Sequence, residues 1–150
     1  MEKRTRQLAA WTENGQLRLI PSLLEELSRP YLAEIASLYD RYQGEKDELA
    51  MILRLSRTYE AYGNLLLGCG RLAEAYRQFV ESASVCLSCS DRFWLDGEFG
   101  WTVVRPLRTR FYTMYGRCKR MLRSHPTLAA LDLERRLDAD YESIQLTIVA

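Results

Sequence analysis

The sequence predicts an all-α protein built from antiparallel helical hairpins, and three observations lead to this prediction. Strong helix formers such as Leu, Ala, Arg and Glu are plentiful, whereas the β-branched residues Val and Ile are scarce. No stretch alternates apolar and polar residues in the manner of a half-buried strand. Apolar residues instead recur at intervals of three and four, the spacing that places them on one face of a helix.

The first elements are expected to be two helices separated by a short break. A weak helix over 3–13 ends at Asn14-Gly15. Pro21 can begin the second helix, because its missing N–H costs nothing in a first turn. Pro30 should kink or split that helix, since proline removes a hydrogen bond from a helix interior. Gly44 closes the unit.

Two helices with clear apolar stripes follow. The third covers about 46–67 and ends at Gly68-Cys69-Gly70, and the fourth covers 72–87. On the fourth helix the side expected to face the core consists of Leu72, Ala75, Tyr76, Phe79, Val80, Ala83 and Leu87.

The second half of the chain contains an irregular segment and two further helices. Residues 88–105 combine two Gly and two Trp, which predicts a short helix or packed loop, and Pro106 can begin the next regular helix. His125-Pro126 ends it, because the residue before proline avoids the helical region. Thr127 can cap a last helix that extends to about Leu146. The chain is therefore expected to form one domain over 1–150 with six or seven helices.

Residues 56–89 follow a pattern of small and large residues that suits two closely packed antiparallel helices. Gly63 and Ala75 let the helices approach closely, and Gly70 allows a tight turn between them. The eight positions of this pattern are Tyr59, Tyr62, Gly63, Leu66, Gly70, Ala75, Phe79 and Ser82. The segment resembles a tetratricopeptide (TPR) repeat, a 34-residue helix–turn–helix unit.

The resemblance covers one repeat well and others only in part. Tyr112-x-x-Tyr115-Gly116 echoes Tyr59-x-x-Tyr62-Gly63, which is consistent with an insertion between two hairpins. The fold is therefore expected to be a TPR-like array or a right-handed helical bundle that contains one TPR-like hairpin.

The resemblance also implies a function, because the first helix of each repeat lines a concave groove in this family. Arg57, Glu60, Asn64 and Leu67 take the groove-facing positions. Asn64 resembles the Asn with which chaperone-tail-binding members hold a peptide, whereas Glu60 stands where those members have a Lys. Asn64 can also be interpreted as a solvated helix residue. The implied function is a non-catalytic protein-interaction module that binds a peptide or helix in this groove.

The charge distribution supplies an alternative. The chain carries 21 Lys+Arg and 20 Asp+Glu, a formal net charge of +1, yet 99–131 contain seven Lys and Arg and no acidic residue. Such a helix could hold phosphates, which makes a nucleic-acid-associated protein the alternative function. The low net charge favours a different interpretation, in which acidic residues of 132–142 pair with this face. The candidate anionic-partner face consists of Arg105, Arg108, Arg110, Tyr112, Arg117, Lys119 and Arg120.

Motifs for catalysis or metal binding are missing from the sequence. Cys86-x-x-Cys89 is a single pair, whereas a structural zinc site needs four ligands. The single histidine, His125, lies at a predicted helix end, where a cation suits the helix dipole. No phosphate-binding loop, dinucleotide fingerprint, zinc-protease motif or nucleophile elbow occurs. We therefore expect no enzyme activity, no cofactor and no metal.

Location and partners follow from the remaining patterns. No apolar segment typical of a secretory signal precedes Trp11, and no run approaches the length of a membrane span. We expect a cytoplasmic protein with a protein or peptide partner and no contact with a membrane. Self-association through the Trp-rich segment is a variant of this hypothesis, with anchors at Phe93, Trp94, Phe99 and Trp101.

Overall fold

The computed structural model describes residues 12–13, 16–17, 21–42, 48–87 and 97–149. In this part the chain forms five α-helices and two 3₁₀ helices, and the all-α prediction is confirmed. A hairpin of two short strands, β1 (Thr12–Glu13) and β2 (Gln16–Leu17), precedes them. The helices are α2 (Pro21–Tyr42), α3 (Glu48–Gly68), α4 (Leu72–Ser84), η1 (Val85–Leu87), α6 (Gly97–Ser124), η2 (Pro126–Leu131) and α7 (Glu134–Val149).

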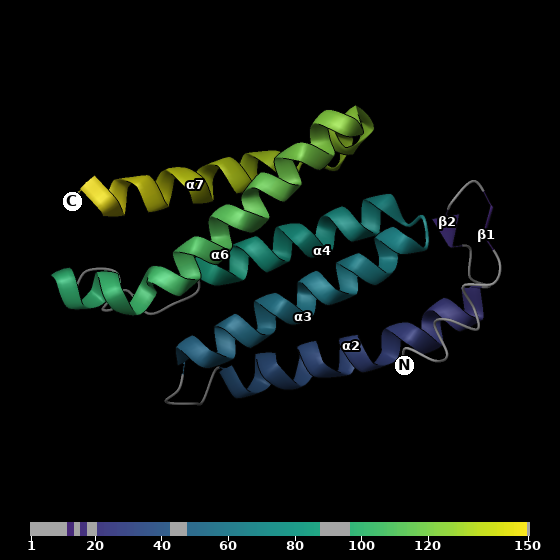
Figure 1. The fold of residues 1–150 in the computed structure, drawn as a ribbon, viewed down its shortest axis with the longest axis horizontal. Helices are drawn as coiled ribbons and strands as arrows, with labels where there is room; N and C mark the ends of the chain where they lie inside the picture. The colour runs from purple at the N-terminus through teal and green to yellow at the C-terminus, as the bar shows by residue number, and fades with distance from the viewer. Residues whose placement is uncertain (1–11, 14–15, 18–20, 43–47, 88–96, 150) are drawn as a thin grey trace.

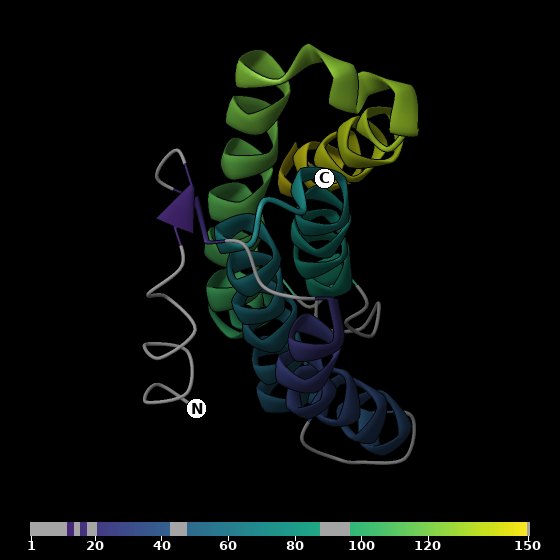
Figure 2. The same ribbon diagram turned by 90° about the vertical axis from the view of Figure 1, so that its right-hand side faces the viewer.

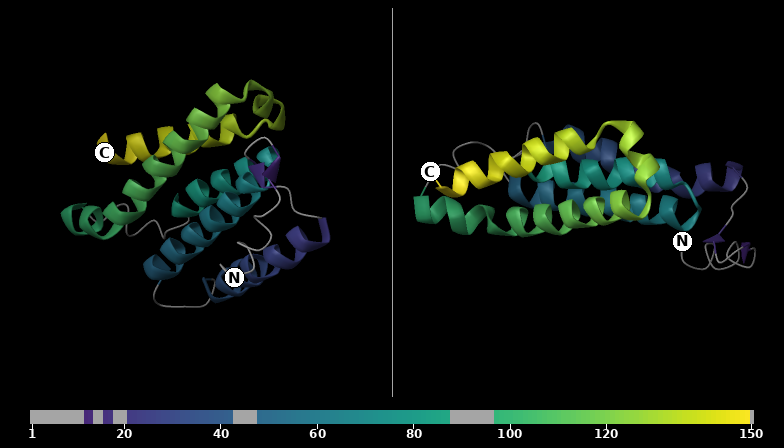
Figure 3. Two further views of the ribbon diagram at one scale, coloured as in Figure 1. Left: turned by 45° about the vertical axis from the view of Figure 1, so that its right-hand side comes forward. Right: turned by 90° about the horizontal axis from the view of Figure 1, so that it is seen from above.

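The helices form a layered array in which chain neighbours lie side by side. Helices α2, α3 and α4 follow one another in space, α6 crosses α4, and η2 turns the chain back into α7 (Figure 1). The turned view places α2 at one end of the array and α6 with α7 at the other (Figure 2). The left view of Figure 3 shows the same order after a smaller turn, and the right view shows the array from above. Among the described helices, none lies against the outer flanks of α2 and α7.

One main apolar core runs through the array and joins residues from α2 to α7. Helix α4 contributes most densely, since Ala75, Tyr76, Phe79, Val80 and Ala83 are all fully buried. The apolar stripe predicts these five residues, and the two others that it predicts, Leu72 and Leu87, are half-buried against the core. A smaller cluster packs beside the main core and consists of Leu38, Met51, Leu55 and Val85.

The N-terminal prediction is wrong where the structure describes it. Thr12 and Glu13 belong to strand β1 instead of a helix over 3–13, and Thr12 pairs with Leu17. Residues 3–11 lie outside the described part. Asn14-Gly15, interpreted as a helix stop, is also the pair that two-residue hairpin turns favour.

Pro30 does not split its helix, and Pro106 does not begin one. Pro30 lies inside the continuous helix α2, and Pro106 lies inside α6, which already begins at Gly97. The irregular segment predicted over 88–105 is therefore helical from Gly97 onward, while 88–96 lie outside the described part. Each proline lacks the N–H that would donate to the carbonyl four residues earlier. Because both prolines are exposed, water can donate to that carbonyl instead.

The last helix begins later in the chain than predicted. The helix before it ends at Ser124, as predicted, but Thr127 lies in η2, and α7 begins only at Glu134. The helix η2 ends just before Asp132, whose φ of 56° is left-handed. Asp tolerates this conformation better than most residues. Within the described ranges, no helix combines the length and apolar character that a membrane span requires.

Candidate functional site

Helices α3 and α4 pack closely at Gly63. A Cβ atom added to Gly63 would lie 2.6 Å from Cε1 of Phe79, so the ring occupies the space that a side chain would need. Gly70 has a φ of 79° and ends α3 together with hydrogen bonds from Arg71 N to Leu66 O and from Gly70 N to Leu67 O. The roles expected for Gly63 and Gly70 from their small size are therefore confirmed.

The predicted groove and the predicted basic face meet at Glu60. Nη2 of Arg110 lies 2.9 Å from one carboxylate oxygen of Glu60, and Nη1 of Arg117 lies 3.3 Å from the other. Arg117 also donates a hydrogen bond to Asn64 Oδ1, and its guanidinium carbon lies 4.0 Å above the ring centre of Phe79. We call Glu60, Asn64, Arg110 and Arg117 the Glu60 cluster. It binds α6 to α3 and occupies two of the four predicted groove residues.

A buried layer of serines continues the Glu60 cluster toward α4. Ser56 Oγ donates to Ser82 O and Ser82 Oγ donates to Ser56 O, both at 2.7 Å, and Arg110 Nε donates to Ser56 Oγ at 2.7 Å. The thiol of Cys86 donates to Ser82 O at 3.4 Å. Burial raises the pKa of this thiol, so it stays protonated. The layer is a set of satisfied hydrogen bonds and offers no activated nucleophile.

This layer of serines is difficult to predict from the sequence. Ser82 fits the pattern only as a small residue, and Ser56 carries no signal beyond its place on the buried face of α3. Two serines 26 positions apart become partners only because α3 and α4 pack tightly.

Lys119 pairs with the acidic C-terminal helix, as the interpretation based on net charge expects. Its Nζ lies 2.7 Å from Glu134 and 2.7 Å from Asp138, and Tyr115 donates to Asp138 at 2.9 Å. Burial alone would lower the pKa of Lys119, but its hydrogen bonds to Asp138 and Glu134 outweigh burial and raise it. For Asp138, burial would raise the pKa, and the bonds from Lys119 and Tyr115 lower it overall.

The other residues of the candidate anionic-partner face differ in burial and in their partners. Arg108 is buried, and burial lowers the pKa of its guanidinium group. Tyr112 accepts a hydrogen bond from Gln145 at 3.0 Å. Arg105 and Arg120 are exposed. The structure therefore divides the predicted face into paired, buried and exposed residues, which do not form one continuous basic surface.

An open hollow of about 280 Å³ lies between α2 and α3. Arg57 lines it and is exposed, whereas Leu67 is half-buried against the main core. Arg54 crosses one side of the hollow to Glu34, with 2.7 Å between Nη2 and Oε1. Tyr31, which also lines the hollow, stacks on Tyr62 with ring centres 5.9 Å apart. The lining residues are Pro30, Tyr31, Glu34, Arg54, Arg57, Thr58 and Ala61.

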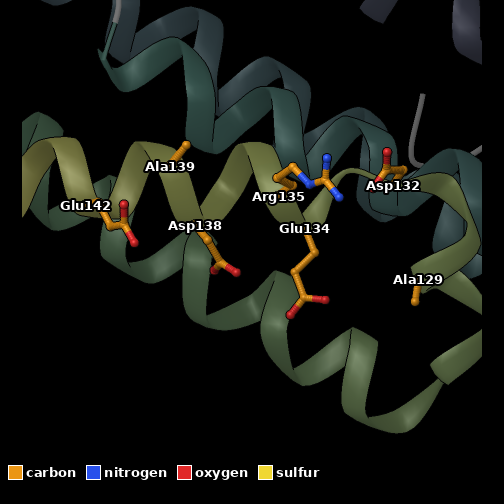
Figure 4. Close-up of a pocket in the computed structure, with 7 residues that line it drawn as sticks. All are labelled: Ala129, Asp132, Glu134, Arg135, Asp138, Ala139 and Glu142. Carbon is orange, nitrogen blue, oxygen red and sulfur yellow. The ribbon is translucent and has the colours of Figure 1, made fainter.

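A second hollow, of about 480 Å³, lies against η2 and α7 and is mainly acidic. Figure 4 shows the side chains of Glu134 and Asp138 pointing to the same side of α7. Both carboxylates already pair with Lys119, so part of this acidity is neutralised within the protein. The lining residues are Ala129, Asp132, Glu134, Arg135, Asp138, Ala139 and Glu142.

The cysteines are distributed through the fold. Cys86 and Cys118 are buried, Cys69 is half-buried, all three are free thiols, and Cys89 lies outside the described part. Burial raises the pKa of Cys118 to about 12. Among the described residues, no three His, Cys, Asp or Glu side chains come together as a metal site would require.

Comparisons with known protein families, with curated proteins and with solved structures found no match to this chain.

Proposed function

We propose that this chain is a non-catalytic protein-interaction module of the cytoplasm, which binds a peptide or a helix in the hollow between α2 and α3. The observation that carries the proposal is Arg57, an exposed guanidinium beside a hollow with apolar walls at Pro30, Tyr31 and Ala61. Among the described residues Arg57 has no ion-pair partner, so its charge is available to a ligand. Apolar walls with a few polar groups at the edge are typical of ligand sites.

The hairpin of 56–89 is still proposed to be TPR-like, but its ligand site lies on a different side of α3 from the predicted groove. The close contact of Gly63 with Phe79 and the left-handed turn at Gly70 support a TPR-like hairpin. Because the Glu60 cluster holds Glu60 and Asn64 against α6, the ligand is expected beside Arg57 on the α2 side of α3. The three free thiols are consistent with a reducing compartment.

The alternative of nucleic-acid binding through 105–123 receives less support. Arg110, Arg117 and Lys119 are held by carboxylates of the same chain. A phosphate backbone would have to compete with these pairs, which lowers the expected affinity. No observation favours that function over peptide binding.

The test is a selection from a displayed random-peptide library against the full chain, followed by fluorescence anisotropy with the selected peptides. Arg57→Glu should weaken binding about tenfold or more, which corresponds to about 1.4 kcal/mol. Ala61→Trp should weaken it by filling the hollow. Arg77→Glu is the matched control, because Arg77 is also an exposed arginine and lies on α4. If both hollow variants bind the peptides as well as the control does, the proposed site is wrong.

A further inference from the structure

The outer flank of α2 carries the two large hydrophobic residues that stand out as exposed in the described part. Leu32 is 49% exposed and Tyr39 is 50% exposed. With Arg29 and Ala36, which are also exposed, they occupy positions 29, 32, 36 and 39. This alternation of three and four residues forms one continuous seam along a helix, as in a coiled coil. We call these four residues the α2 seam.

The α2 seam and the hollow lie on opposite sides of the same helix. At about 100° per residue, Leu32 and Tyr39 project on one side of the stripe that packs against α3, and Pro30 and Glu34 project on the other. Leu24, Leu27 and Leu38 form that buried stripe. Since α2 ends the array (Figures 1 and 2), no described helix covers its outer flank.

We propose that the α2 seam is the contact surface for a second copy of this chain, with the two α2 helices antiparallel. The last helix of a helical array needs a polar outer face if it is to stay exposed to water. The outer face of α2 carries Leu32 and Tyr39 instead. An antiparallel pair about a two-fold axis places Leu32 of one copy against Ala36 of the other, so a large residue meets a small one. The same register places Arg29 beside Tyr39 and Asp40 of the second copy.

Charge complementarity is what selects a second copy as the occupant. Arg29 and Asp40 are exposed, and neither pairs with another residue in the described part. In the antiparallel register each copy supplies one Arg29 and one Asp40, so the contact contains two opposite-charge pairs. Each Arg29 can also lie over the ring of Tyr39, an arrangement that attracts a cation to an aromatic face. A parallel pair would instead place like charges together.

The contact is short, so the dimer should be weak. Interfaces below about 1,200 Å² are typical of transient association, and a single helix pair of three turns falls in that class. We expect monomer and dimer to exchange at micromolar concentrations. The hollow stays open in such a dimer, which therefore carries two copies of the proposed peptide site.

Sedimentation of the full chain over a range from low micromolar to near-millimolar concentration tests the proposal. The wild type should shift from monomer to dimer, and Leu32→Glu should raise the dissociation constant about tenfold or more. Ser37→Glu is the matched control, because Ser37 is exposed on the other side of α2 and should leave the dissociation constant unchanged. Circular dichroism checks that each variant keeps its helices, and Tyr39→Ser replaces Leu32→Glu if helix content falls.

A charge exchange tests the register. Arg29→Asp and Asp40→Arg should each weaken the dimer about fivefold, since exposed pairs contribute modestly. An equal mixture of the two variants should recover wild-type association, because both pairs between unlike chains are then of opposite charge. A chain that remains monomeric at every concentration, a dimer that tolerates both Leu32→Glu and Tyr39→Ser, or a mixture no stronger than its components would each overturn the proposal. Peptide binding should be unaffected by Leu32→Glu, so failure of the seam and failure of the hollow are distinguishable.

Discussion

Arg110 and Glu60 are 50 positions apart in the chain, yet Nη2 of Arg110 lies 2.9 Å from a carboxylate oxygen of Glu60. Their side chains are only 15% and 26% exposed, so water screens the pair less than it screens a surface pair. Arg117 contacts the second oxygen of the same carboxylate. One carboxylate on α3 thus pairs with two arginines of α6, and removal of its charge leaves both arginines without a counter-charge.

Glu60→Gln is expected to lower the free energy of unfolding by about 1–3 kcal/mol, because a partly buried pair loses one charge while the other stays. Chemical denaturation measures this change. Glu74→Gln is the control: Glu74 pairs with Arg71 at 3.2 Å on the surface, and its loss should cost about 0.5 kcal/mol or less. Equal losses in the two variants would show that the Glu60 cluster is no more than a surface pair.

Periodicity along the chain was enough to predict the helical fold and most buried faces. Leu107, Phe111, Met114 and Cys118 are fully buried on α6, as their spacing indicates. The pattern is local, and for this reason it works where the structure is set by a single helix. The pattern is ambiguous where one residue is compatible with two structures. Pro106 is an example, because a proline can begin a helix or lie on the exposed side of a longer one.

The candidate site was less predictable, because periodicity identifies a buried face without identifying the helix that covers it. Glu60 and Asn64 were expected in an open groove, and α6 lies against them instead. The sequence also suggests that acidic residues of 132–142 pair with the basic helix. Lys119 does so, whereas Arg110 and Arg117 form ion pairs with Glu60. Only the packing of α6 on α3 decides between these partners.

Gly63→Ala is expected to destabilise the protein by about 1–2 kcal/mol. Overpacking against Phe79 costs about 1–3 kcal/mol, which the better helix propensity of Ala offsets only in part. Gly68→Ala is the control, because a Cβ at Gly68 would meet nothing within 4 Å, and this variant should gain up to about 1 kcal/mol. Thermal and urea unfolding measure both. A stabilised Gly63→Ala variant would mean that the ring of Phe79 moves aside freely.

Two aspartates of α7 should respond to substitution in opposite directions. Bonds from Lys119 and Tyr115 outweigh burial and lower the pKa of Asp138, so its charge stabilises the folded state at neutral pH. Burial raises the pKa of Asp140 despite a bond from Ser84, so its charge disfavours the folded state there. At pH 7, Asp138→Asn should therefore cost about 1 kcal/mol or less, and Asp140→Asn should be stabilising.

The pH dependence follows from the same shifts. The stability supplied by Asp138 is complete above its ordinary pKa of 3.8 and is lost as the pH falls through its lowered folded value. The penalty at Asp140 disappears as the pH falls through its raised value toward 3.8. Unfolding curves at a series of pH values should therefore show each variant converging on wild type in acid. Parallel curves at every pH would contradict both assignments.

Two tyrosines allow the same comparison for a hydroxyl group. Tyr76 is fully buried, its hydroxyl has no hydrogen-bond partner among the described residues, and burial raises its pKa to about 12. The hydroxyl of Tyr115 donates to Asp138 at 2.9 Å. Because an unsatisfied buried hydroxyl costs about 1–3 kcal/mol, Tyr76→Phe should stabilise the protein, while Tyr115→Phe should lose about 0.5–1.5 kcal/mol with its bond. Urea denaturation decides the signs, and a destabilised Tyr76→Phe variant would reveal a partner for that hydroxyl.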